Sequence, residues 1–180
     1  MTTPLVEPSA LSNFIKESCP TSLSESEQVY HQLAVHVLHD LQYQHIWSNL
    51  SLHLLSPLTG DPLPRPIISG FPPKRVYVHP DEQIENLDKG VREEDLPSEP
   101  EWVLPTQIRE KWSLKAFAGV FDAITETPQE PIRSLDERKT SESNSKPRRG
   151  GKRILLATVN DDSTIVYYII HDGIVKPRQN

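Results

Sequence analysis

The sequence is poor in cysteine and has no long hydrophobic run. Cys19 is the only cysteine among 180 residues, so no disulfide can form within the chain. A chain without disulfides fits the reducing cytosol or nucleus better than secretion. The first twenty-odd residues hold no apolar h-region, and no apolar run reaches the length of a membrane span. We therefore expect neither a secretory signal nor membrane insertion.

Several sequence patterns of enzyme sites are also missing. The chain has no Walker loop, no Rossmann glycine pattern, no Gly-x-Ser-x-Gly, no HExxH and no Cys-x-x-Cys. A group of histidines and an aspartate lies between residues 31 and 45: His31, His36, His39, Asp40 and His45. Zinc would need a third ligand and supporting hydrogen bonds from elsewhere in the fold. We therefore interpret these as exposed helix histidines and expect no metal and no cofactor.

Glycine is also scarce, and charge is unevenly distributed. Seventeen prolines against seven glycines, with 36% hydrophobic residues, indicate a modest core with long irregular segments. The net charge of −6 argues against a stand-alone nucleic-acid binder. Between Asp81 and Pro100, eight acidic residues against two basic ones already give −6. The rest of the chain is balanced, which leaves RNA contact open for a folded part.

Two amphipathic helices stand out. Ser24 and Glu27 match a capping box at the start of a helix over Ser24–Trp47. Apolar residues then recur at intervals of three and four, from Tyr30 to Leu41. The second helix has Ser113 as its candidate N-cap and an apolar face through Ile124. An earlier start, at Thr106, stays open.

Alternation and turn residues predict five strands. The first covers Leu50–Leu55, and the next two cover the short segments 65–69 ("RPIIS") and 75–79 ("RVYVH"). The last two form a hairpin of 153–159 and 164–170, joined by the turn Asn160–Ser163.

These elements predict a small α+β (α/β) fold with a mixed sheet, in the order α-β-β-β-α-β-β. Residues 1–23 are expected to be a disordered tail, because they are polar and show no period. Residues 24–176 are expected to form a single domain. Its polar inserts are the acidic segment 81–100 and the segment 125–151.

The last strand is apolar on both faces. Alternation puts Val166, Tyr168 and Ile170 on one face, and the residues between them, from Ile165 to Ile169, on the other. Leaving either set in water would forgo about 1.5–3 kcal/mol for each large side chain. Either a partner chain covers one face, or the two helices lie on opposite sides of the sheet. The residues alone leave both readings open.

A tyrosine–histidine–lysine group lies in the same region. Tyr167, Tyr168, His171 and Lys176 could in principle run a metal-free RNA cleavage. However, four residues of strand separate Tyr167 from His171 by about 13 Å, and Tyr168 faces the other way. We therefore favour the interpretation that the tyrosines pack within the fold and that His171 lies at the end of the strand.

A basic run, "KPRRGGKR", precedes the hairpin. Its candidate RNA contacts are Arg148, Arg149, Lys152 and Arg153. A nuclear import signal and a solvated linker are the alternatives.

The segments "DSTIVYYIIHDGIVKPRQN" and "EWVLPTQIREKWSLKAFAGVFDAI" resemble the smallest, non-catalytic subunit of the eukaryotic tRNA-splicing endonuclease, in its fungal form. The match at Asp162–Gly173 is the most specific part, and the first helix fits the same family. The resemblance implies the mixed C-terminal fold of these endonucleases. It also implies a heterotetramer of two catalytic and two structural subunits that cuts introns from precursor tRNA.

The resemblance further implies a partner interface along the last hairpin. The expected partner-binding residues are Asp161 and Asp162 in the turn and Val166, Tyr168 and Ile170 on the strand. No segment matches the family's catalytic tyrosine and histidine, so no catalytic residue is assigned and precursor tRNA is expected as an indirect partner. The expected location is the nucleus, or the cytoplasmic face of mitochondria. A nuclease acting by itself and a homodimeric scaffold are the alternatives.

Overall fold

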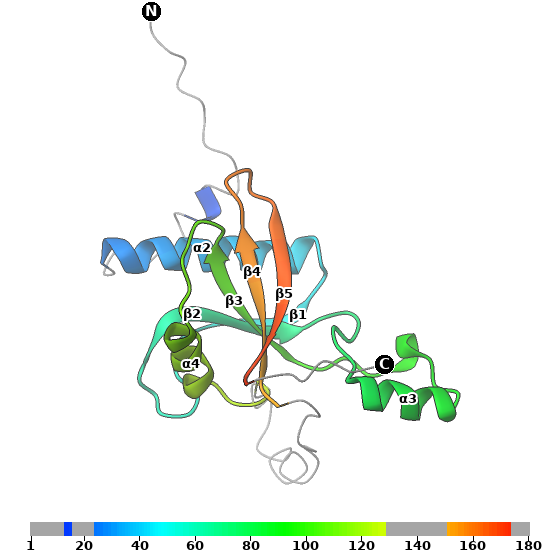
Figure 1. The fold of residues 1–180 in the computed structure, drawn as a ribbon. Helices are drawn as coiled ribbons and strands as arrows, with labels where there is room; N and C mark the ends of the chain where they lie inside the picture. Colours follow the sequence, from blue (N-terminus) through cyan, green and yellow to red (C-terminus); the bar gives the residue numbers. More distant parts are fainter. Residues whose placement is uncertain (1–12, 16–23, 129–150, 174–180) are drawn as a thin grey trace, which may run out of the picture.

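The computed structural model describes residues 13–15, 24–128 and 151–173. The chain enters the described part through a short helical stretch at 13–15. The elements then follow as α2 (Glu25–Tyr43), β1 (Ser48–Leu55), β2 (Pro62–Phe71), α3 (Pro80–Asp88), the 3₁₀ turn η1 (Glu93–Asp95), β3 (Glu101–Gln107), α4 (Leu114–Ala123), β4 (Arg153–Val159) and β5 (Ile165–His171) (Figure 1). The architecture is a mixed α+β fold, as the sequence predicts.

The five strands form one sheet in the order β1-β2-β3-β4-β5. All neighbours are antiparallel except β3 and β4, which run parallel. Parallel neighbours need a crossover connection, and α4 lies within the one between β3 and β4. Because β4 is the only strand that pairs with β5, β5 is an edge strand in the described part of the chain.

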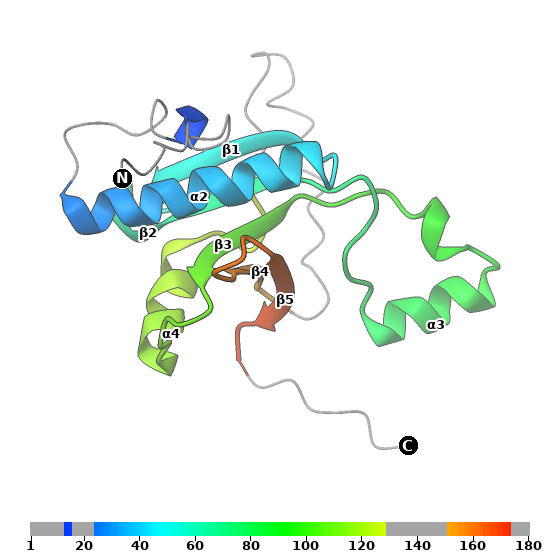
Figure 2. The same cartoon turned by 90° about the horizontal axis from the view of Figure 1, so that it is seen from above.

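The two longer helices lie on opposite faces of the sheet (Figure 2). Val37 and Leu41 of α2 pack on one face against Ile68, Val103 and residues of β4. On the other face, α4 packs against a different set of strand residues; this cluster holds Ile67, Trp102, Leu104, Val120, Phe121, Ile124 and Ile154. The sequence left open whether the two helices lie on opposite sides of the sheet, and they do. However, β5 is at the edge of the sheet and not in its centre.

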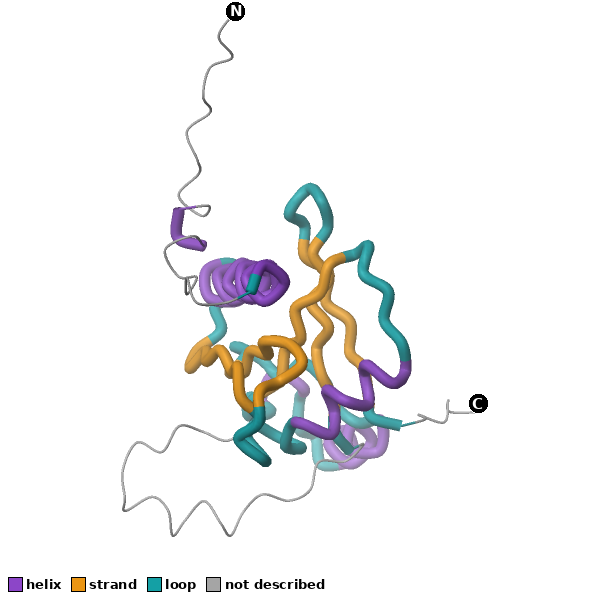
Figure 3. Tube along the Cα trace, turned by 90° about the vertical axis from the view of Figure 1, so that its left-hand side faces the viewer, coloured by secondary structure: helices purple, strands orange, loops and turns teal. Residues whose placement is uncertain are grey.

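Helix α2 begins and packs as its sequence predicts. The Ser24 hydroxyl accepts a hydrogen bond from the Glu27 backbone N–H, and the Glu27 carboxylate accepts one from the Ser24 backbone N–H. The Ser24 hydroxyl also donates to the Glu27 carboxylate, and the bonds from this hydroxyl and from the Ser24 N–H lower the pKa of the Glu27 carboxyl because they favour its charged form. The helix is seen end-on beside the strands in Figure 3. At α4, Ser113 caps the helix through the Ala116 backbone N–H, so the later of the two open starts is correct.

The third strand is not where the alternation predicts it. Residues 75–79 are irregular, and β3 is Glu101–Gln107, which runs beside β2 and β4. Six of its seven residues are buried, so it shows no polar alternation, as is usual for a strand covered on both faces. Glu101 and Pro105 make this strand difficult to predict from the sequence, because a charged residue and a proline normally argue against a central strand.

The acidic segment is an ordered lobe rather than a plain solvated insert. It contains α3 and η1, which stand away from the sheet in Figures 1 and 2. Pro80 at the first helical position and the His79 side chain, which accepts from the Asp81 backbone N–H, start α3. Neither α3 nor η1 contains a buried residue, so the lobe adds little to the core.

Most of the expected tail 1–23 and of the segment 125–151 lies outside the described residues. No helix in the described part is long and apolar enough to span a membrane. The proposed single domain over 24–176 stays a prediction.

Candidate partner interface

The outer edge of β5 carries apolar side chains that the fold leaves in water. Val166 is 44% exposed, Tyr168 is 55% exposed and Ile169 is 37% exposed. All three flank the one edge of the strand that pairs with no other described strand. An edge strand presents free backbone donors and acceptors, so β5 offers both polar and apolar contacts to another chain.

The predicted interface residues of β5 do not share one environment. Val166 and Tyr168 lie on the α4 side of the sheet, beyond the reach of the second core cluster. Ile170 lies on the same side, but it packs against that cluster and is half-buried. Ile169, on the α2 side, is exposed and was not among the predicted contacts.

Tyr167 is tied to α2. Its hydroxyl donates a hydrogen bond of 2.8 Å to Oδ2 of Asp40, and the His45 ring meets the Tyr167 ring edge-on at 5.2 Å. His45 Nε2 also lies 3.4 Å from the same Asp40 oxygen. Burial, together with the hydrogen bond to Asp40, raises the pKa of Tyr167 far above its usual value. This tyrosine therefore anchors β5 to the first helix as a neutral phenol.

Among the described residues, Tyr167, Tyr168 and His171 do not converge on one site, which agrees with the favoured reading of these residues. Tyr167 points to α2 and Tyr168 is on the opposite face of the strand. His171 packs edge-on against Tyr77, at 5.0 Å between ring centroids. Lys176 lies outside the described residues.

The hairpin turn presents Asp161 and Asp162 at the tip of the sheet. Backbone bonds from Asn160 N–H to the Thr164 carbonyl and from Ser163 N–H to the Asn160 carbonyl close the turn. The Asp162 carboxylate accepts a bond of 3.0 Å from the Thr164 N–H, which lowers the pKa of this exposed carboxyl. Asp161 forms an ion pair with Arg109, and both side chains are largely exposed.

The candidate RNA contacts fall into three groups. Arg148 and Arg149 lie outside the described residues. Lys152 donates from Nζ to the Phe121 carbonyl at 2.9 Å, so it bridges to the end of α4. Arg153 is 5% exposed and is ion-paired with Glu101, which is 1% exposed. The prediction that Arg153 contacts RNA does not fit this structure, because a buried and paired guanidinium is not accessible to a phosphate.

Arg153 belongs to a chain of charges that joins the acidic lobe to the sheet. Its Nη2 also lies 3.1 Å from the Glu99 carboxylate, which in turn pairs with Arg75. Arg75 then reaches Glu82 of α3 at 2.6 Å. Sequence reasoning missed this network, since its members are up to 78 residues apart and no local pattern links them.

The histidines of α2 do not form a metal site. No group of three or more histidine, cysteine, aspartate or glutamate side chains that could hold a metal lies in the part of the chain described here. The expectation that these histidines are exposed is correct for His45 alone among the four, since His31 is 5% exposed and His36 and His39 are half-buried. Burial lowers the pKa of His31. Burial also lowers the pKa of His36, although the nearby charge of Asp40 acts in the opposite direction and raises it.

Comparison with known proteins agrees with the resemblance seen in the sequence. The family model described as "Sen15 protein" matches residues 36–180. The chain belongs to the Sen15 family. This match covers β1 to β5 and the last eight residues of α2.

Two curated relatives of this Sen15-family chain are fungal. It is 49% identical over 150 residues to the "Probable tRNA-splicing endonuclease subunit tsp-1" of Neurospora crassa, covering 80% of this chain and 64% of the relative. It is 27% identical over 157 residues to the "Probable tRNA-splicing endonuclease subunit sen15" of Schizosaccharomyces pombe, covering 87% of this chain and 88% of the relative. The chain thus spans slightly less than two thirds of the length of the first relative and most of the second.

Proposed function

We propose that this chain is a non-catalytic structural subunit of the tRNA-splicing endonuclease, which removes introns from precursor tRNA. In the proposed complex, two catalytic and two structural subunits form a heterotetramer, and this chain pairs with a catalytic subunit through β5. The observation that carries the proposal is the apolar edge of β5 in a chain that belongs to the Sen15 family. The names of the two relatives agree with it.

The physics of an edge strand supports pairing. A strand of a partner can continue the sheet through backbone hydrogen bonds while its side chains cover Val166 and Tyr168 on one face and Ile169 on the other. Tyrosine is enriched among residues that dominate binding energy, since its ring is large and its hydroxyl can stay hydrated or bonded. Two faces of one edge would thus be covered by a single partner element.

The arrangement of the titratable groups supports a structural rather than a catalytic role. General acid–base catalysis needs groups that converge on one reacting centre. Tyr167 instead donates to Asp40 within the core, and Tyr168 faces away from it. The alternative of a nuclease acting alone predicts that the purified chain cleaves precursor tRNA and that His171→Ala abolishes this cleavage.

The interface is tested by placing a charge on the open face. Tyr168→Glu should weaken association with a co-expressed catalytic subunit by several kcal/mol, because a carboxylate in a desolvated interface lacks a partner. Tyr168→Phe is the matched control and should copurify nearly as wild type. The measurement is the yield and mass of the purified complex by size-exclusion chromatography with light scattering. Copurification of Tyr168→Glu at wild-type yield would show that β5 is not the contact.

The same measurement separates the proposed pairing from a homodimeric scaffold. An apolar edge can also pair with its own copy. If the chain by itself has the mass of a dimer and this dimer persists when the catalytic subunit is added, the scaffold reading is correct. The proposal expects a one-to-one pair instead.

We also propose that the turn at Asp161 and Asp162 docks on basic residues of another subunit. The carboxylates stand at the exposed tip of the hairpin, and Asp161 already shows the kind of contact involved by pairing with Arg109. Asp161→Asn combined with Asp162→Asn should leave the chain folded and weaken assembly at low salt, with a smaller dependence on ionic strength. Parallel salt titrations for wild type and the double variant would contradict the docking.

Candidate RNA contacts and the cellular location complete the proposal, in which precursor tRNA is mainly an indirect partner. Arg148, Arg149 and Lys152 are the proposed contacts to precursor tRNA, and their replacement by alanine should reduce the salt slope of RNA binding by the complex. The proposed location is the nucleus, with the cytoplasmic face of mitochondria as the alternative. Imaging of a fluorescent fusion distinguishes the two compartments.

A further inference from the structure

A groove of about 250 Å³ lies in the acidic lobe, between α3 and the segment 91–96 that contains η1. Its apolar lining comes from Leu87 of α3, from Val91 just after this helix, and from Val78 and Leu96. Leu87 is 71% exposed and Val91 is 36% exposed, so another molecule can reach both side chains. The lobe itself stands away from the sheet (Figures 1 and 2).

The turn after α3 gives the groove its shape. The Gly90 N–H donates to the Leu87 carbonyl at 3.0 Å, and the Val91 N–H donates to the Asn86 carbonyl at 2.8 Å. This is the Schellman pattern of a helix C-terminus, in which Gly90 takes a φ of +68° that side chains disfavour. The chain therefore reverses at Gly90, and the groove exists before any ligand binds, which reduces the entropy cost of binding.

Ion pairs hold the lobe against the sheet, although the lobe adds nothing to the core. The Arg75 side chain is 10% exposed and pairs with Glu82 of α3 and with Glu99, which also pairs with Arg153 of β4. Neither α3 nor η1 contains a buried residue. The apolar side chains of the groove are thus ordered and accessible without serving the interior of the protein, as is typical of an interaction surface.

The rim of the groove at η1 carries excess negative charge. Arg92 lines the groove, but its guanidinium already lies 3.7 Å from Glu94 and 3.1 Å from Asp95. Glu93 also lines the groove and is exposed. The rim therefore holds three carboxylates against one guanidinium, and a cation of another molecule can approach Glu93.

The charge of the surrounding chain has the same sign. Over residues 74–99, eight acidic residues stand against four basic ones, with the ion-paired residues included on both sides. Arg153, which reaches this network from β4, is itself paired with Glu101. Such a field attracts a basic polypeptide and repels the phosphates of RNA or of an anionic membrane.

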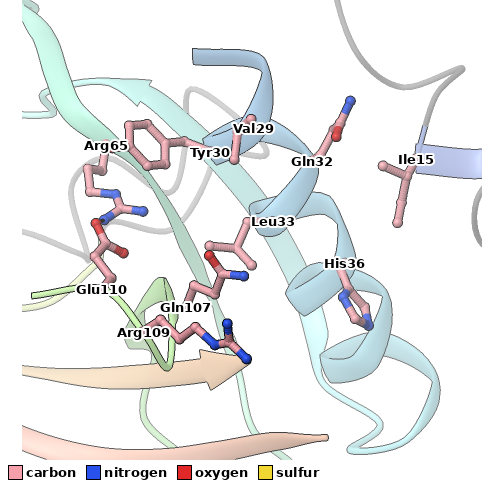
Figure 4. Close-up of a pocket in the computed structure, with 10 residues that line it drawn as sticks. All are labelled: Ile15, Val29, Tyr30, Gln32, Leu33, His36, Arg65, Gln107, Arg109 and Glu110. Atoms are coloured by element: carbon pink, nitrogen blue, oxygen red, sulfur yellow. Dashed lines mark hydrogen bonds and ion pairs between the residues drawn. The ribbon is translucent and has the colours of Figure 1, made fainter. Parts of the chain in front are cut away.

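A larger hollow, of about 480 Å³ between α2 and the residues after β3, shows no comparable excess of charge (Figure 4). Arg65 is paired with Glu110, and Arg109 is paired with Asp161. The cations that line this hollow are thus compensated within the chain. The groove of the lobe is the one of the two whose charge selects a class of partner.

We propose that the groove of the acidic lobe binds a basic segment of a partner polypeptide. An apolar side chain of this segment packs against Leu87 and Val91, and a neighbouring lysine or arginine lies beside Glu93. Burial of the apolar side chain supplies affinity, and the charge favours fast association with basic partners. This surface is separate from β5 and does not depend on which complex the chain joins.

The test uses the full ¹⁵N-labelled chain and the peptide acetyl-Lys-Leu-Leu-Lys-amide as probe. The backbone amide signals of Gly90 and Val91 should shift in a saturable way, because both lie in the wall of the groove. The peptide acetyl-Glu-Leu-Leu-Glu-amide reverses the charge, and acetyl-Lys-Ser-Ser-Lys-amide removes the apolar side chains. Each of these two should bind at least about tenfold more weakly, since each lacks one of the two contributions.

Two variants connect the response to the groove. Leu87→Asn should weaken binding of the Lys-Leu-Leu-Lys probe about five- to tenfold and leave the melting midpoint unchanged, because the side chain is exposed in the free protein. Leu114→Asn is its matched control, since Leu114 is 89% exposed on α4. Glu93→Gln should weaken binding about two- to fivefold and reduce its salt dependence, whereas Asp122→Asn on α4 should change neither.

Four results would overturn the proposal. The first is no saturable shift of Gly90 and Val91 with the Lys-Leu-Leu-Lys probe, and the second is equal binding of the three peptides. The third is a dimer of the isolated chain that Leu87→Asn dissociates, because a second copy would then fill the groove. The fourth is a shift of the same signals when residues 174–180 are removed, because the chain's own segment would then be the occupant. All four are measured without a catalytic subunit, so they leave the test of pairing through β5 independent.

Discussion

Replacing Arg153 by methionine is expected to destabilise the fold without a direct effect on RNA binding. Arg153 is 5% exposed, and its guanidinium pairs with the carboxylate of Glu101, a residue that is 1% exposed. Methionine keeps much of the length and the apolar contacts of the arginine side chain. What it removes is the charge that compensates the carboxylate of Glu101.

The magnitude follows from the burial of that carboxylate. Breaking a buried pair by removing one partner costs about 3–5 kcal/mol, because the remaining charge is left in a medium of low polarity. For a domain of this size, a loss of that order lowers the melting midpoint by on the order of 10 °C. The loss of Arg153 costs less free energy at Glu99, because Glu99 is partly exposed and keeps its contact with Arg75.

The assay is urea unfolding followed by circular dichroism, with thermal unfolding as a second measurement. Arg153→Met combined with Glu101→Gln should be more stable than Arg153→Met alone, because no uncompensated carboxylate remains. Arg92→Met is the matched control: that side chain is 71% exposed, so the change should stay within about 0.5 kcal/mol. If Arg153→Met lowers the free energy of unfolding by less than about 1 kcal/mol and also weakens RNA binding, the reasoning is wrong and Arg153 contacts RNA.

Three further outcomes are expected from the same structure. Replacing 83–96 by a short Gly-Ser linker, which keeps Glu82 as a partner of Arg75, should cost less than about 1 kcal/mol by urea unfolding, because α3 and η1 bury no residue and loop closure depends weakly on length; a larger loss would show that the lobe supports the core. Tyr167→Phe should cost about 1 kcal/mol through the lost bond to Asp40, whereas Tyr168→Phe should cost almost nothing; equal costs would contradict the anchoring role of Tyr167. Burial lowers the pKa of His53 below its usual 6.5, so the unfolded chain takes up a proton first and the free energy of unfolding should fall as the pH drops below about 6.5. Thermal unfolding between pH 7.5 and 5 should show a smaller fall for His53→Gln, and an unchanged slope would refute the assignment.

Local sequence determines the elements whose signals are local. The capping box at Ser24 and Glu27, the three–four spacing along α2, the N-cap at Ser113 and the turn between β4 and β5 all involve neighbours within a few residues. Such signals do not depend on the rest of the fold. The helices α2 and α4 and the strands β1, β2, β4 and β5 therefore follow from the sequence, as does the doubly apolar character of β5.

Tertiary structure decided the features that join distant residues. It placed the third strand at Glu101–Gln107, since a buried charge is acceptable there only because Arg153 arrives from a strand some fifty residues later. It also decided that α2 and α4 cover opposite faces of the sheet and that β5 lies at one of its two edges, with β1 at the other. The attachment of the acidic lobe has the same origin, because Arg75, Glu99 and Arg153 must meet before the lobe is joined to the sheet. Side-chain pairing across the sheet is an energy of contacts between remote segments, and no pattern along the chain encodes it by itself.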